Sequence, residues 1–73
     1  MKKSIHTKER AVFVKRLKQA REEAGLTQVD VAEKLGCSQS WVSKIELGEL
    51  RVEAIWLARL AKLYGRDISY FVK

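Results

Sequence analysis

Glycine divides this chain into segments, because the sequence contains no proline and its four glycines are widely spaced. They stand at positions 25, 36, 48 and 65. Between them apolar residues recur at intervals of three and four, which is the period of an amphipathic helix. The recurring residues are Phe13, Leu17, Ala20 and Ala24, then Val31, Ala32 and Leu35, then Val42 and Ile45, then Leu57, Leu60, Ala61 and Tyr64. No alternating pattern typical of strands is found, so the sequence predicts an all-α chain.

Residues that cap helix ends mark the boundaries of these segments. Thr7, Thr27 and Ser38 suit N-terminal capping positions, and Thr27 stands three residues before Asp30. The glycines suit C-terminal positions, where a positive φ is needed. Together these signals predict five helices, at residues 7–24, 28–35, 39–46, 52–64 and 67–72.

The size of the chain limits what it can do. A length of 73 residues predicts one domain, residues 1–73, with a modest core and no separate catalytic module. No apolar run is long enough to span a membrane, and no secretory signal is found near Met1. The single cysteine, Cys37, and the single histidine, His6, exclude an internal disulfide and predict no metal site. We therefore expect a cytoplasmic protein without a cofactor.

Positive charge is concentrated in the N-terminal third of the chain, and the remainder is close to neutral within a net charge of +6. Through residue 21 the only acidic residue is Glu9. The basic residues there are Lys2, Lys3, Lys8, Arg10, Lys15, Arg16, Lys18 and Arg21. Such asymmetry favours a polyanionic partner, either nucleic acid or an anionic membrane surface, although a solvated helix face would give the same pattern.

The segment SQSWVSKIE, residues 38–46, carries polar side chains on a short predicted helix. At about 100° per residue, Val42 and Ile45 cluster on one side of that helix. If these two anchor the helix to the core, polar side chains able to match base edges point outward, namely Gln39, Ser40, Ser43 and Lys44. The preceding helix joins this one through Gly36, Cys37 and Ser38. Residues 28–46 therefore predict a helix-turn-helix, whose second helix enters the DNA major groove.

The stretch GLTQVDVAEKLGCSQSWVSKIELGE resembles the helix-turn-helix family of phage repressors and Cro proteins, often called the XRE family. The resemblance runs from about Phe13 to Phe71. It implies a compact five-helix bundle of the lambda-repressor-like type that binds operator DNA, typically as a dimer. It also implies a largely buried ion pair between Arg21 and Glu46.

The same resemblance implies roles for the polar residues around the turn. Gln39, Ser40 and Lys44 would read bases, whereas Thr27 and Gln28 would contact phosphate. Ser38 and Arg51 would contact the DNA backbone beside the groove.

Several of these residues also have a simpler interpretation. Gln28 and Ser38 could cap helices, a role compatible with phosphate contact because exposed N–H groups at a helix start attract anions. Trp41 could contact the DNA backbone at a sugar, or a thymine methyl group, or it could pack beside the turn. Cys37 is most simply a small apolar residue of the core, and His6 belongs to the N-terminal tail.

A second apolar stripe runs along the predicted fourth helix, about 100° to 160° from its core stripe. Its members are Val52, Ile55, Trp56 and Leu63. Either the first helix covers this stripe or it is a subunit interface, continued by Ile68, Tyr70 or Phe71. We favour a homodimer, because a two-fold protein matches a palindromic DNA site.

Together these features predict a sequence-specific transcriptional regulator that binds double-stranded DNA, with repression as its expected effect. Residues 1–6 are expected to form a flexible basic arm that contacts DNA. The alternative is a protein-interaction module, such as an antitoxin that binds its partner through the second stripe and uses DNA binding for autoregulation. An enzyme is not expected, because we find no paired carboxylates in a glycine-bounded pocket, no nucleophile with a base and no phosphate loop.

Overall fold

The computed structural model describes residues 7–72, which form five α-helices and contain no strand. The helices are α1 (Lys8–Glu23), α2 (Gln28–Leu35), α3 (Gln39–Glu46), α4 (Ala54–Tyr64) and α5 (Ser69–Val72). This result confirms the all-α class and the number of helices. The basic arm expected at residues 1–6, with His6, lies outside the described residues.

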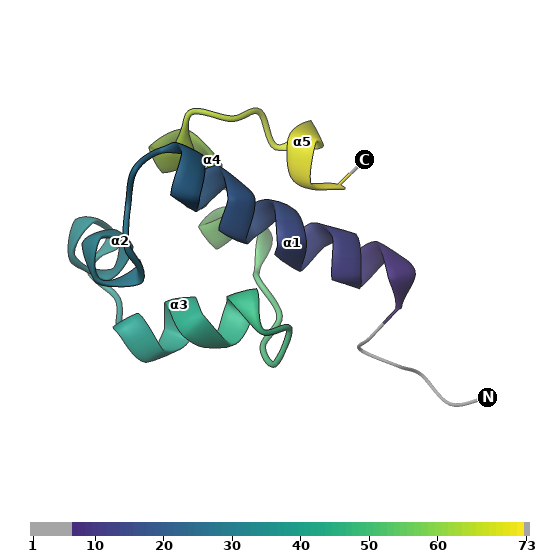
Figure 1. The fold of residues 1–73 in the computed structure, drawn as a ribbon, viewed down its shortest axis with the longest axis horizontal. Coiled ribbons are helices and arrows are strands. Elements are labelled where there is room, and N and C mark those ends of the chain that lie inside the picture. Colours follow the sequence, from purple (N-terminus) through teal and green to yellow (C-terminus); the bar gives the residue numbers. More distant parts are fainter. Residues whose placement is uncertain (1–6, 73) are drawn as a thin grey trace.

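The longest helix, α1, organises the bundle. Figure 1 shows α1 crossing the molecule with α3 on one side of it and α5 on the other, and α1 contacts α3, α4 and α5. The helices α2 and α3 pack against each other. Two arginines of α1 also reach neighbouring segments, since Arg10 Nη2 donates to the Leu50 carbonyl at 2.6 Å and Arg16 Nη1 donates to the Tyr70 carbonyl at 2.8 Å.

These contacts change the interpretation of the basic N-terminal third. Arg10 and Arg16 bond to carbonyls, and Arg21 bonds to Glu46, so three cations of α1 hold the fold together. Lys15 and Lys18 remain exposed. The charge count alone therefore overstates how much of α1 is available to a polyanion.

The core is formed by the apolar faces of all five helices. Its buried members are Leu17, Ala20, Val31, Ala32, Val42, Ile45, Leu57, Leu60, Ala61, Tyr64 and Phe71. Phe13 and Leu35 are partly buried against this cluster, whereas Ala24, the C-terminal cap of α1, is exposed. Burial raises the pKa of the Tyr64 hydroxyl, so this side chain stays neutral in the core. The three- and four-residue spacing thus identified most of the core.

Two predicted helix starts were two residues early. The fourth helix begins at Ala54 rather than residue 52, and its N-cap Glu53 makes no side-chain capping bond, so no sequence signal marked the start. The fifth helix begins at Ser69 rather than residue 67. There the Asp67 carboxylate accepts bonds from the Ser69 N–H at 3.0 Å and the Ser69 hydroxyl at 2.6 Å, which forms a turn before the helix. These bonds lower the pKa of Asp67.

Candidate nucleic-acid interface

The start of α2 is fixed by a reciprocal pair of hydrogen bonds. Asp30 N–H donates to Thr27 Oγ1 at 3.0 Å, and Thr27 N–H donates to Asp30 Oδ2 at 2.9 Å. The backbone N–H and the hydroxyl of Thr27 together hold the pKa of Asp30 below its usual value. Thr27 is therefore the cap of α2, and Gln28 is the first residue of the helix rather than a cap. Thr27 is exposed, so it lies where a DNA backbone can approach the start of α2.

The turn between α2 and α3 is closed by glycine. Gly36 ends α2 with a φ of 70°, a left-handed conformation that costs other residues free energy, and Cys37 N–H donates to the Ala32 carbonyl at 3.0 Å. Ser38 then caps α3, because its hydroxyl accepts from Trp41 N–H at 3.1 Å. Cys37 is half-buried against the core, and burial raises the pKa of its thiol. The short turn and its hydrogen bonds thus set the position of α3 beside α2.

One side of α3 is buried and the opposite side is polar. Val42 and Ile45 are fully buried in the core, as the spacing predicted. We call the other side, formed by Gln39, Ser40, Ser43 and Lys44, the polar face of α3. Gln39, Ser40 and Lys44 are exposed, whereas Ser43 is only partly so. Three of the four predicted base-reading side chains are thus accessible together on one helix.

A buried ion pair connects α1 to the end of α3. Arg21 Nε donates to Glu46 Oε2 at 2.7 Å, and Arg21 Nη2 donates to Glu46 Oε1 at 3.0 Å. The two side chains are only 10% and 4% exposed. Arg21 Nη1 also donates to the Leu26 carbonyl at 2.9 Å, and the hydrogen bond to Glu46 raises the pKa of Arg21. The structure therefore contains the pair that the resemblance implied, with its donors well satisfied.

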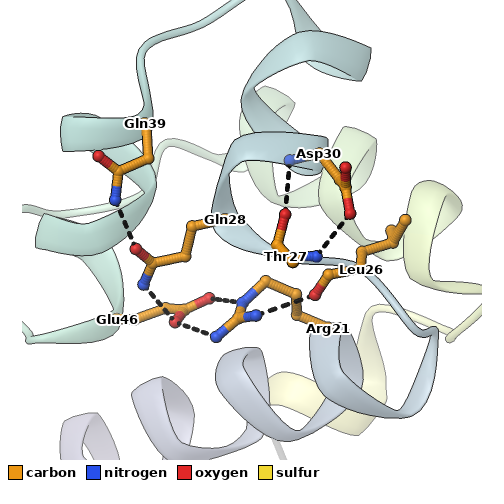
Figure 2. Close-up of polar contacts among 7 residues, drawn as sticks. All are labelled: Arg21, Leu26, Thr27, Gln28, Asp30, Gln39 and Glu46. Atoms are coloured by element: carbon orange, nitrogen blue, oxygen red, sulfur yellow. Dashed lines mark hydrogen bonds and ion pairs between the residues drawn. The ribbon is translucent and has the colours of Figure 1, made fainter.

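Figure 2 shows that this pair is the inner end of a longer network, which we call the relay. Gln28 Nε2 donates to Glu46 Oε1 at 3.1 Å, and Gln39 Nε2 donates to Gln28 Oε1 at 2.7 Å. The relay thus runs from Arg21 through Glu46 and Gln28 to Gln39. Sequence reasoning treated Gln28 and Gln39 as separate contacts and missed the bond between them. The available signal was that both residues directly follow an N-cap, which places each at the first position of its helix.

Comparison of the chain with models of protein families identifies its family. The family model described as a helix-turn-helix domain matches residues 12–69, which is most of the chain. The chain belongs to the helix-turn-helix domain family. No significant match was found among curated proteins or among solved structures.

Membership in the helix-turn-helix family supports DNA as the binding partner of this chain. In helix-turn-helix domains generally the second helix of the motif enters the major groove, and α3 is the second helix of the motif here. The helix-turn-helix comprises α2, the Gly36 turn and α3, and its bounds agree with the predicted residues 28–46. Among the described residues, no group of three His, Cys, Asp or Glu side chains could hold a metal ion, and no helix is long and apolar enough to cross a membrane.

Trp41 of the helix-turn-helix packs against Trp56 of α4. Their ring centroids are 5.1 Å apart at an angle of 54°, and the Arg59 guanidinium lies 5.0 Å from the centre of the Trp56 ring. The structure shows that Trp41 packs within the chain, and a DNA contact by this partly exposed side chain stays a prediction. Arg51 is exposed in the segment that follows α3, where its phosphate contact also stays a prediction.

The second stripe of α4 is largely covered within the chain. Val52 and Leu63 pack against the core, and Trp56 is half-buried beside Trp41. Ile55 is the exposed member, at 59%. Phe71, which was considered as a continuation of an interface, is instead 1% exposed in the core because α5 folds back on α1.

Proposed function

We propose that this helix-turn-helix protein is a sequence-specific transcriptional regulator that reads the major groove with α3 and acts as a repressor of the XRE type. The observation that carries this proposal is the division of α3, with Val42 and Ile45 buried and Gln39, Ser40 and Lys44 exposed together. Amide, hydroxyl and ammonium groups match the edges of bases in the major groove. A repressor needs only to occupy its site, which a bound domain of this size does.

The backbone contacts follow from the two helix starts of the motif. Thr27 and Ser38 cap α2 and α3, and the uncapped N–H groups of these first turns attract phosphate. Arg51 would add a charged contact beside the groove, and the edge of Trp41 a sugar contact. These residues position the protein, whereas the polar face of α3 selects the sequence.

Selection of bound duplexes from a random pool tests the proposal directly. We expect one enriched motif, and recovery of unrelated sequences would contradict sequence-specific binding. Lys44→Ala should then cost about 1–3 kcal/mol on the selected site and much less on a scrambled duplex, because a base contact is lost. Lys62→Ala is the matched control, since it removes the same charge from an exposed position in the last turn of α4.

Arg51→Ala separates phosphate contacts from base contacts. It should weaken binding to the selected and scrambled duplexes alike and lower the slope of affinity against salt by about one unit. Binding isotherms at two or more salt concentrations measure both effects. An equal loss of binding free energy on both duplexes for Lys44→Ala would identify Lys44 as a phosphate contact. The polar face of α3 would then not be the base-reading surface.

We further propose that the protein binds a palindromic operator as a homodimer. Support comes from exposed apolar side chains between α3 and the first turn of α4, at Leu47, Leu50 and Ile55. Ile55→Asp is the sharper test, because Trp56 packs internally and its replacement would disturb α4. We expect a folded monomer by sedimentation and half-sites about one helical turn apart in the selected DNA. A parent protein that sediments as a monomer both alone and on its selected DNA contradicts the homodimer.

A different outcome would favour the protein-interaction function. If Ile55→Asp leaves self-association and DNA binding unchanged but abolishes capture of a co-expressed partner, this surface serves that partner. DNA binding by α3 would then be autoregulatory, as in an antitoxin.

A further inference from the structure

The segment that joins α3 to α4, residues 47–53, has few hydrogen bonds of its own. Figure 1 shows it on the same side of α1 as α3. Glu49 N–H donates to the Lys44 carbonyl at 2.9 Å, which completes the turn after α3. Beyond this point, the backbone of residues 50–52 makes one hydrogen bond within the part of the chain that the structure describes, and its donor is Arg10 of α1.

Arg10 ties this segment to the first helix. Its Nη2 donates to the Leu50 carbonyl at 2.6 Å, across 40 positions of sequence. A hydrogen bond from a charged donor is stronger than one between neutral groups. Arg10 Nε is buried without a partner among the described residues, so the guanidinium lies against the protein. One turn further along α1, Val14 Cγ1 would lie 3.9 Å from a Cβ placed on Gly48. The N-terminal half of α1 therefore meets the segment at two points.

The turn of α1 that carries Arg10 has a cap of its own. Arg10 N–H donates to Thr7 Oγ1 at 3.1 Å, and Ala11 N–H donates to the Thr7 carbonyl at 2.9 Å. The match to the helix-turn-helix model covers residues 12–69 and begins after this turn. The contact between Arg10 and the segment is therefore not covered by the family match.

Arg51 stands between two held neighbours. Leu50 is bonded at its carbonyl to Arg10, and Val52 packs against the core. Arg51 itself is exposed. A charged side chain on an ordered backbone binds an anion with a smaller loss of conformational entropy than one on a free loop. The bond from Arg10 thus orders the backbone that presents Arg51.

We propose that Arg10 is a positioning residue for DNA binding, which ties residues 47–53 to α1 and holds Arg51 where it can bind a phosphate. This inference rests on the proposed function and specifies how its charged backbone contact is presented. Because Arg10 acts through Arg51, its contribution to affinity is lost when Arg51 is replaced. A phosphate contact carries no sequence information, so base selection by α3 is unchanged.

The bond is tested first in the protein without DNA. Arg10→Met removes the donor and keeps a long apolar side chain. Lys8→Met is the matched control, since it removes one positive charge from an exposed position in the same turn of α1. Backbone ¹⁵N order parameters at residues 50–52 should fall from about 0.8 to below about 0.7 in Arg10→Met and stay at the parent values in Lys8→Met. Parent values retained in Arg10→Met overturn the inference.

A double-mutant cycle with Arg51→Ala then measures the coupling on the selected duplex. In the parent, Arg51→Ala should weaken binding and lower the salt slope by about one unit. In Arg10→Met, the fold-loss from Arg51→Ala should be at least about threefold smaller, and the slope should change by about half a unit or less. In Lys8→Met, the effect of Arg51→Ala should equal that in the parent. Thermal unfolding verifies that each variant is folded.

The outcomes separate this inference from the proposed function. An equal loss from Arg51→Ala in the parent and in Arg10→Met overturns the positioning role while sequence-specific binding stands, and any loss from Arg10→Met alone is then a direct phosphate contact. A parent that binds its site but is insensitive to Arg51→Ala overturns the role too. A parent that selects no sequence overturns the proposed function and, with it, the role of Arg10 in DNA binding.

Discussion

Two arginine–glutamate pairs start from the same end of α1 and differ in almost everything else. Arg21 and Glu23 are two residues apart, and each pairs with a distant segment, at Glu46 and Arg66. The first pair is buried and makes two hydrogen bonds, whereas the side chains of the second are 38% exposed for Arg66 and 55% for Glu23. Water competes for the second pair and is largely excluded from the first, so breaking the first pair is expected to cost more stability.

The largest effect is expected from Glu46→Ala. It leaves the Arg21 guanidinium buried without its carboxylate, which costs about 3–5 kcal/mol of stability. Chemical denaturation measures this loss, with Glu49→Ala as a control that removes an exposed glutamate three residues away. A Glu46→Ala variant that unfolds with the parent would show that burial does not distinguish the two pairs.

An intermediate effect is expected when both partners of the buried pair are replaced together. Arg21→Met with Glu46→Leu removes both charges and refills their volume, so the double variant should recover more than half of the loss seen in Glu46→Ala. Apolar replacements of buried pairs are often neutral or stabilising, which is the physical reason for this recovery. A double-mutant cycle gives the coupling energy. If the stability loss of the double variant equals the sum of the losses of the two single variants, the expected recovery is contradicted.

The smallest effect is expected from Glu23→Ala at the exposed pair. Its loss should be below about 1 kcal/mol and should shrink as salt is added, because exposed charges are screened. Arg66 also lies over the Tyr70 ring at 4.7 Å, a contact that the substitution leaves in place. Denaturation at low and high salt tests this prediction, and a loss as large as that of Glu46→Ala would remove the distinction between the pairs.

Local signals made part of this fold predictable. The caps Thr27 and Ser38 and the glycine at 36 act on neighbouring residues, so the bounds of α2 and α3 agreed with the sequence-based prediction. The second stripe of α4 was harder, because a helical period does not reveal that Val52 and Leu63 pack against the core. The burial of Phe71 depends in the same way on the return of α5 to α1.

The candidate site was also predictable only in part. Helical geometry placed Gln39, Ser40 and Lys44 on one exposed side, but the bond between Gln39 and Gln28 depends on side-chain conformations across two helices. The intramolecular bonds of Arg10 and Arg16 were also invisible to a charge count. The base and phosphate contacts themselves stay predictions, because they depend on a partner whose sequence is not encoded in the spacing of this chain.

The tryptophan contact between α3 and α4 gives this protein a built-in optical reporter. Trp41 and Trp56 are the chain's two tryptophans, and their rings lie 5.1 Å apart. At this separation we expect their electronic transitions to couple, so the circular dichroism of the folded chain should contain a contribution from this contact. Fluorescence excited at tryptophan wavelengths reports on the same contact. Because Trp41 belongs to α3, ligand titrations and unfolding can both be followed in the native protein without attaching a dye.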